Sequence, residues 1–155
     1  MSLKVNLEQI IEGMEMQSEQ NRSFLNLKTG EVVFVSQEVL TIAEDEDEYE
    51  NLPEWQQDEL ETAKTIVFHM DQYASLPSSF EINEYNMMED FCYSLSDQQK
   101  RDLLLNSIHG KGAFRRFKDK IHQLEISDQW YAFRDQKYTE IAIEFCESKN
   151  LDCTE

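Results

Sequence analysis

The sequence predicts an α+β domain that is mainly helical, with about six helices and a small antiparallel sheet built on a hairpin at residues 23–35. Apolar residues recur at helical spacing along most of the chain, and the hairpin segment carries a glycine turn between two strand-like stretches. The chain has 155 residues, 40% of them hydrophobic, which suits one folded core. We therefore expect residues 1–155 to form a single domain.

The N-terminal part predicts one helix followed by the hairpin. Asn6 occupies an N-cap position ahead of an apolar stripe of helical spacing, which predicts a helix over 6–18. Segments 23–27 and 31–35 then flank a short connection in which Gly30 supplies the positive φ of a tight turn. Together they predict two antiparallel strands.

A short helix and an acidic segment follow the hairpin. Ser36 is placed to cap a helix that runs to Ala43. Residues 44–51 are dominated by carboxylates, which repel one another and stay hydrated, so we expect a flexible loop rather than a calcium site. Pro53 then opens a further helix, and we expect Trp55 to lie on its apolar face.

The rest of the chain is predicted to be helical after one short extended segment. Residues 72–76 form an extended segment that stops before Pro77, which favours a third strand. A capping box at Ser96 opens a helix whose leucines cover more than half its circumference, so we expect that helix to be central and buried. One predicted helix begins at residue 84, and three more span residues 97–108, 113–124 and 128–149.

The charge distribution is uneven. The chain holds 14 basic and 32 acidic residues, a net charge of −18, which disfavours nonspecific binding of nucleic acid. Half of the basic residues lie within residues 100–120, where only two acidic residues occur. A local basic patch is therefore expected on an acidic protein.

The sequence lacks the patterns that would indicate export, a membrane span or a catalytic site. It has no signal-like apolar run and no stretch long enough to span a membrane, so we expect a cytoplasmic protein without a membrane partner. The three cysteines show no C-x-x-C spacing, and we interpret Cys92 and Cys146 as inert core residues. The histidines lack ligand spacing and no nucleophile motif occurs, so we predict no metal, no cofactor and no catalytic residue.

The distinctive motif is the ten-residue stretch 110–119, Gly-Lys-Gly-Ala-Phe-Arg-Arg-Phe-Lys-Asp. On a helical wheel its two phenylalanines share an inward face, so we expect them to anchor the helix. The glycines precede a helix N-terminus, an arrangement that binds phosphate or carboxylate. The candidate anion or partner site is Lys111, Gly112, Arg115, Arg116 and Lys118. The alternative is that these cations pair with carboxylates inside the protein.

Arg134 is the second unusual feature, because it falls on the apolar face of the last predicted helix. A guanidinium in that position needs a partner, so we predict a buried, structural ion pair. Glu59, which also falls on an apolar helix face, Glu89 and Asp119 are the candidate carboxylates.

Three segments also carry a resemblance: Met-Glu-Asp-Phe at 88–91, the ten residues at 110–119, and Trp-Tyr-x-Phe-Arg-Asp at 130–135. With the start of the chain and the hairpin, they make it similar to a family of small bacterial proteins of uncharacterised function. The resemblance spans nearly the whole chain and implies no reaction, cofactor or site residue. The chain departs from the family pattern before Pro77, which weakens the prediction of the third strand.

Three functional hypotheses follow. In the first, a noncatalytic interaction protein presents the basic helix 111–120 to an acidic or phosphate-bearing macromolecule, most simply a protein, with nucleic acid engaged only at that helix. In the second, the acidic surface of residues 38–61 mimics nucleic acid and binds a basic protein. In the third, Arg115, Arg116 and Glu89 form an enzyme site.

Overall fold

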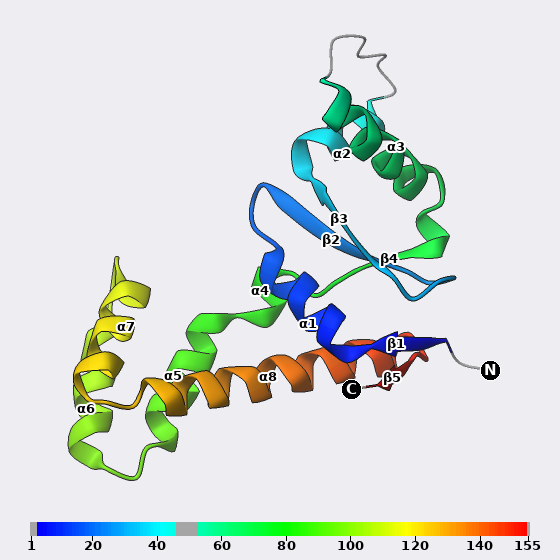
Figure 1. Ribbon diagram of the computed structural model, residues 1–155. Coiled ribbons are helices and arrows are strands. Elements are labelled where there is room, and N and C mark those ends of the chain that lie inside the picture. The colour runs from blue at the N-terminus through cyan, green and yellow to red at the C-terminus, as the bar shows by residue number, and fades with distance from the viewer. Residues whose placement is uncertain (1–2, 46–52, 155) are drawn as a thin grey trace. The chain divides into compact units, whose positions relative to one another are not determined.

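The computed structural model describes residues 3–45 and 53–154 (Figure 1). Its helices are α1 (Leu7–Met16), α2 (Gln37–Glu44), α3 (Glu54–Phe68), α4 (Ser79–Ile82), α5 (Glu84–Ser94), α6 (Gln98–Ser107), α7 (Ala113–Gln123) and α8 (Ser127–Ser148). Its strands are β1 (Lys4–Asn6), β2 (Asn21–Asn26), β3 (Val32–Ser36), β4 (Tyr73–Ser75) and β5 (Asp152–Thr154). The predicted mainly helical α+β class is confirmed. Most of the predicted acidic loop, from residue 46 onward, lies outside the described residues.

The chain divides into two compact units. The first contains Met1–Glu81 and Ile141–Glu155, and the second contains Ile82–Glu140. The chain passes from one unit to the other within the short helix α4 and within the long helix α8. The expectation of a single domain stays a prediction.

The first unit holds an antiparallel sheet of strand order β3-β2-β4. Gly30 has φ +80° in the turn between β2 and β3, and its N–H donates to the Asn26 carbonyl at 2.8 Å. This conformation is the one that the glycine was expected to supply. β4 lies inside the segment expected to form a third strand and pairs with β2 from Phe24 to Asn26.

Helix α1 approaches the sheet closely because one of its residues has no side chain. A Cβ on Gly13 would lie 2.6 Å from Leu76 Cδ1 and 2.9 Å from Val32 Cγ1. The buried Ser23 hydroxyl donates to the Gly13 carbonyl at 2.8 Å, which ties β2 to the helix. Asn6 caps α1 as predicted, since its side chain accepts from the Gln9 N–H at 3.2 Å.

Helices α2 and α3 lie side by side and pack on the sheet through a shared hydrophobic cluster (Figure 1). The buried members of this cluster are Phe24, Val35, Val39, Leu40, Ala43, Leu60, Ala63 and Ile66. Ser36 caps α2 as predicted, by accepting from the Val39 N–H. Trp55 was expected in this core, but it is 69% exposed because it lies in the first turn of α3, at the edge of the packed face.

One pair of strands was not predicted. β1 and β5 pair in parallel over three residues each, which joins the two ends of the described chain. Cys146 of α8 and Cys153 of β5 form a disulfide with a Cα–Cα distance of 6.5 Å. The interpretation of Cys146 as an inert core thiol was therefore wrong, because the short loop after α8 brings Cys153 back to it.

The second unit is built from α5, α6, α7 and the first part of α8 around an aromatic cluster. The Trp130 ring makes edge contacts with Phe91 and Phe117, at centroid distances of 5.5 and 4.8 Å. Helix α6 buries one face only, and Leu103 is 43% exposed, so the expectation of a central, buried α6 was wrong. Asp97 caps α6 in place of the expected Ser96, since its carboxylate accepts from two backbone N–H groups.

Candidate functional site

The junction between α6 and α7 is held by Arg116. Its Nε donates to the Ser107 carbonyl at 2.9 Å, and its two terminal nitrogens donate to the carbonyls of His109 and Lys111. The last carbonyls of a helix lack partners inside the helix, and here a guanidinium from the next helix supplies donors. Arg116 is therefore engaged with backbone oxygens, which neither the anion-site hypothesis nor pairing with carboxylates had predicted.

Gly112 gives this arrangement the space it needs. It is the N-cap of α7 with φ +78°, and among the described residues it provides no side-chain cap for the first turn of the helix. A Cβ at this position would lie 3.1 Å from Nη1 of Arg116, whereas a Cβ on Gly110, at φ +77°, would meet nothing within 4 Å. Gly112 was predicted to open an anion site, but it lies against the guanidinium of Arg116, which holds the α6–α7 junction together.

The other three predicted cations of this site lie on the surface. Lys111, Arg115 and Lys118 are exposed, and within the part of the chain that the structure describes none of them forms an ion pair. Arg115 and Lys118 are three residues apart and so lie on the same side of α7, whereas Lys111 lies in the turn before this helix. The structure thus keeps three of the four predicted cations available to a partner.

The two phenylalanines of the motif have different environments. Phe117 is buried in the aromatic cluster, as predicted, whereas Phe114 is 48% exposed. The expectation that both rings anchor the helix was therefore wrong for Phe114, which lies in the first turn of α7, where neighbouring elements leave it uncovered. Lys118 follows Phe114 by one helical turn and lies beside it on the surface.

A pocket of about 220 Å³ opens next to these two residues. Three helices of the second unit line it: α5, α7 and α8. The lining residues are Glu84, Met88, Phe114, Phe117, Lys118, Trp130, Tyr131 and Arg134. The side chains of Met88, Phe117 and Trp130 are buried, whereas Phe114 and Tyr131 are about half exposed. The pocket therefore has a buried apolar lining and two half-exposed rings.

Arg134 and Glu84 supply the fixed charges of the pocket. Arg134 Nη2 lies 2.8 Å from Glu84 Oε1, and the same carboxylate oxygen accepts from the Tyr138 hydroxyl. The guanidinium also lies over the Tyr138 ring, 4.3 Å from its centroid. A buried ion pair was predicted for Arg134, and the two charged side chains of this pair are 22% and 31% exposed, so it is partly buried.

The carboxylate on Arg134 is not one of the three that were expected. Glu59 accepts from the Ser36 N–H at 2.6 Å in the first unit, which explains its place on an apolar helix face. Glu89 is half-buried on α5, and Asp119 is exposed on α7 beside the junction. Helical spacing could have indicated Tyr138, four residues after Arg134, but the sequence holds no signal for Glu84, fifty positions away.

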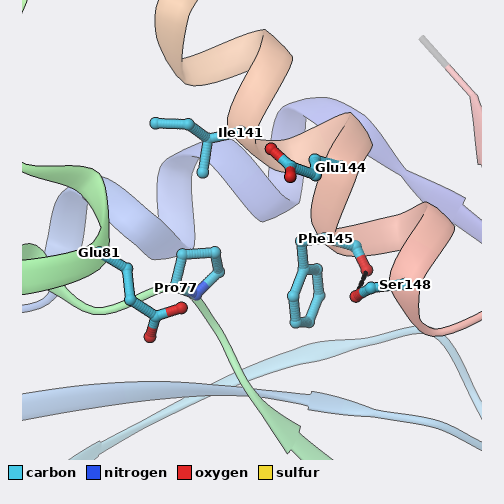
Figure 2. Close-up of a pocket in the computed structure, with 6 residues that line it drawn as sticks. All are labelled: Pro77, Glu81, Ile141, Glu144, Phe145 and Ser148. Atoms are coloured by element: carbon cyan, nitrogen blue, oxygen red, sulfur yellow. Dashed lines mark hydrogen bonds between the residues drawn. The ribbon is translucent and has the colours of Figure 1, made fainter.

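The first unit has pockets of different character. One of about 350 Å³ is lined by Pro77 and Glu81 on one side and by α8 residues, including Glu144 and Phe145, on the other (Figure 2). Ser148 beside it donates to the Phe145 carbonyl at 2.7 Å. Among the described residues, its lining brings together two carboxylates and apolar groups but no cation, histidine or cysteine.

The remaining reactive groups do not gather into a site in the described residues. Burial raises the pKa of the Cys92 thiol to about 11, so the thiol stays protonated near neutral pH and is a poor nucleophile. The described histidine, cysteine and acidic side chains form no group of three or more that could hold a metal ion. None of the described helices is long and apolar enough to cross a membrane.

The structure thus defines an α+β protein whose helical unit carries an aromatic pocket with cationic side chains at its rim. Over residues 2–154 the chain matches the model of an uncharacterised protein family, UPF0158, and it belongs to that family. No curated protein and no solved structure matches the chain.

Proposed function

We propose that this protein is a noncatalytic binding protein that presents the exposed cations of α7 to an acidic or phosphate-bearing partner, most simply a protein. One observation carries the proposal. In a chain with 32 acidic residues, Arg115 and Lys118 lie exposed on one side of α7 and Lys111 lies exposed in the turn before it, and none of the three forms an ion pair in the described structure. Exposed cations carried on one short segment attract an acidic surface and influence the orientation in which it docks.

The rigidity of the junction supports this function. Because Arg116 ties α7 to the end of α6, Arg115 and Lys118 are carried on an anchored helix rather than on a free loop. A preorganised surface loses less conformational entropy when it binds. The exposed ring of Phe114, one helical turn before Lys118, adds apolar area to the same surface of α7.

Charge reversal tests the proposal. The double variant Arg115→Glu with Lys118→Glu should lose the partner that the wild-type protein recovers from a native lysate, with and without RNase, while its thermal midpoint stays nearly unchanged. The matched control reverses Lys64 and Lys149, which are exposed in the first unit and give the same change in net charge. The control should retain the partner. Equal recovery by both double variants would contradict the proposal.

A second candidate function rests on the first unit. A cleft of about 570 Å³ is lined by Phe34, Glu38, Trp55 and Asp58 among others, and the described residues of its lining include acidic but no basic side chains. An exposed tryptophan beside carboxylates suits an arginine or lysine side chain of a basic protein. Under this hypothesis Trp55→Ala would abolish recovery of a basic partner, and unchanged recovery would remove the hypothesis.

A further inference from the structure

The pocket of the second unit has the size of a site for one side chain. Its volume of about 220 Å³ falls below the roughly 300–1,000 Å³ that are typical of small-molecule and cofactor pockets. A single aromatic ring fits such a space, whereas a nucleotide or a larger cofactor does not. The half-exposed rings of Phe114 and Tyr131 lie at this pocket and leave apolar area open to water.

The charges around the pocket select the kind of segment that can enter. The Glu84 carboxylate is already held by Arg134 and by the Tyr138 hydroxyl, so its charge is balanced within the protein. The Lys118 ammonium lies exposed among the lining residues without an ion pair in the described structure, and Arg115 is exposed on the same helix. The surplus charge is therefore positive, which favours carboxylates and disfavours a lysine or arginine anchor.

We propose that this pocket binds one aromatic side chain, phenylalanine in the simplest case, from an acidic peptide segment of a partner protein. The ring packs against the buried faces of Phe117 and Trp130 and between the exposed rings of Phe114 and Tyr131. Carboxylates on either side of the anchor reach Lys118 and Arg115. This inference rests on the proposed function and adds to it the anchor residue and the place where it binds.

The test uses the full-length protein, labelled with ¹⁵N, and three synthetic probes. The first probe has a central phenylalanine flanked on each side by glycine and two aspartates. The second replaces the phenylalanine by alanine, and the third replaces the aspartates by asparagine. Amide shift changes at Phe114, Lys118 and Tyr131 report where each probe binds, and titration gives its Kd.

We expect the first probe to bind about tenfold more tightly than the second, or better, because burial of a ring adds that much affinity. Tyr131→Ala should remove this difference. Tyr93→Ala is the matched control, because Tyr93 is an exposed tyrosine of the same unit that does not line the pocket, and it should leave the difference unchanged.

The outcomes separate the two proposals. If the phenylalanine and alanine probes bind α7 equally well, the pocket is not an anchor site, while the basic surface keeps its proposed function. If neither acidic probe shifts the amides of α7, both proposals fail. If the asparagine probe binds as tightly as the aspartate probe, charge has no part in recognition, which contradicts both the acidic segment and the proposed function.

Discussion

Replacement of Arg116 by alanine tests how the α6–α7 junction is built. The variant loses three donated hydrogen bonds, and the bond from Nε to the Ser107 carbonyl, at 2.9 Å, is the one that is partly buried. A hydrogen bond to a charged group contributes about 1.5–3 kcal/mol. The two exposed bonds add little, since water replaces them. We therefore expect Arg116→Ala to lower the free energy of unfolding by about 2–3 kcal/mol.

For a chain of this length each kcal/mol shifts the thermal midpoint by about 2–4 °C, so the expected decrease is about 4–12 °C. Arg115→Ala is the matched control on the same helix, because Arg115 is exposed and its side chain forms no hydrogen bond or ion pair in the described structure. Its effect should stay within about 0.5 kcal/mol. Thermal and urea unfolding, followed by circular dichroism, compare the two variants. Equal decreases in both would refute the assignment of a structural role to Arg116 alone.

Three further variants test other contacts. Gly112→Ala should destabilise the protein more than Gly110→Ala, because both positions have positive φ but only the first Cβ meets the guanidinium; equal unfolding midpoints would contradict this. Glu84→Gln should lower the free energy of unfolding in urea by about 1–2 kcal/mol. Lys137→Gln, which breaks an exposed ion pair at 4.0 Å, should lower it by less than about 0.5 kcal/mol. A larger decrease in Lys137→Gln than in Glu84→Gln would be the contrary result. At pH 8 native Cys92 should have about a hundredfold less thiolate than an unperturbed thiol, so slow alkylation is expected and fast alkylation would disprove burial.

The Cys92 thiol also makes the stability of the folded protein depend on pH. Its pKa is raised from 9.0 to about 11 in the folded protein because burial disfavours the charged form. The unfolded chain therefore releases this proton first, so the contribution of Cys92 to stability is complete below about pH 9 and is lost as the pH rises through 11. Urea unfolding at pH 8 and pH 10 should show this loss in the wild-type protein and a smaller loss in Cys92→Ala.

Local sequence rules predicted the parts of the fold that depend on neighbouring residues. The caps at Asn6 and Ser36 and the turn at Gly30 are set within a few positions of the chain, and the structure has them as predicted. The parallel pairing of β1 with β5 joins segments at opposite ends of the sequence. A three-residue strand carries no pattern that indicates its partner, so this pairing could not be predicted from the residues alone.

Exposure at the ends of helices was harder to predict. Trp55 and Phe114 both fall on the apolar side of a helical wheel, and both lie in the first turn of their helix, where the packed face ends. A wheel gives the direction of a side chain but not whether another element covers it. Because these rings are uncovered, they belong to the candidate binding surfaces rather than to the core.

The candidate site was predicted in part. The motif at 110–119 identified the helix and its cations, but the role of Arg116 depends on carbonyls up to nine residues earlier, and the sequence does not show how α7 turns back onto the end of α6. Likewise, Glu84 meets Arg134 only because α5 and α8 pack together. Tertiary packing thus decides which charged groups are fixed and which remain available to a partner.

A photocrosslinking amino acid placed at Lys118 tests most directly whether the exposed cations of α7 contact a partner. The same amino acid at Lys64, an exposed lysine of the first unit, is the control. In a native lysate we expect an adduct with an acidic or phosphate-bearing macromolecule from position 118 and none from position 64. No adduct from position 118, or the same adducts from both positions, would show that the exposed cations of α7 do not form a binding surface.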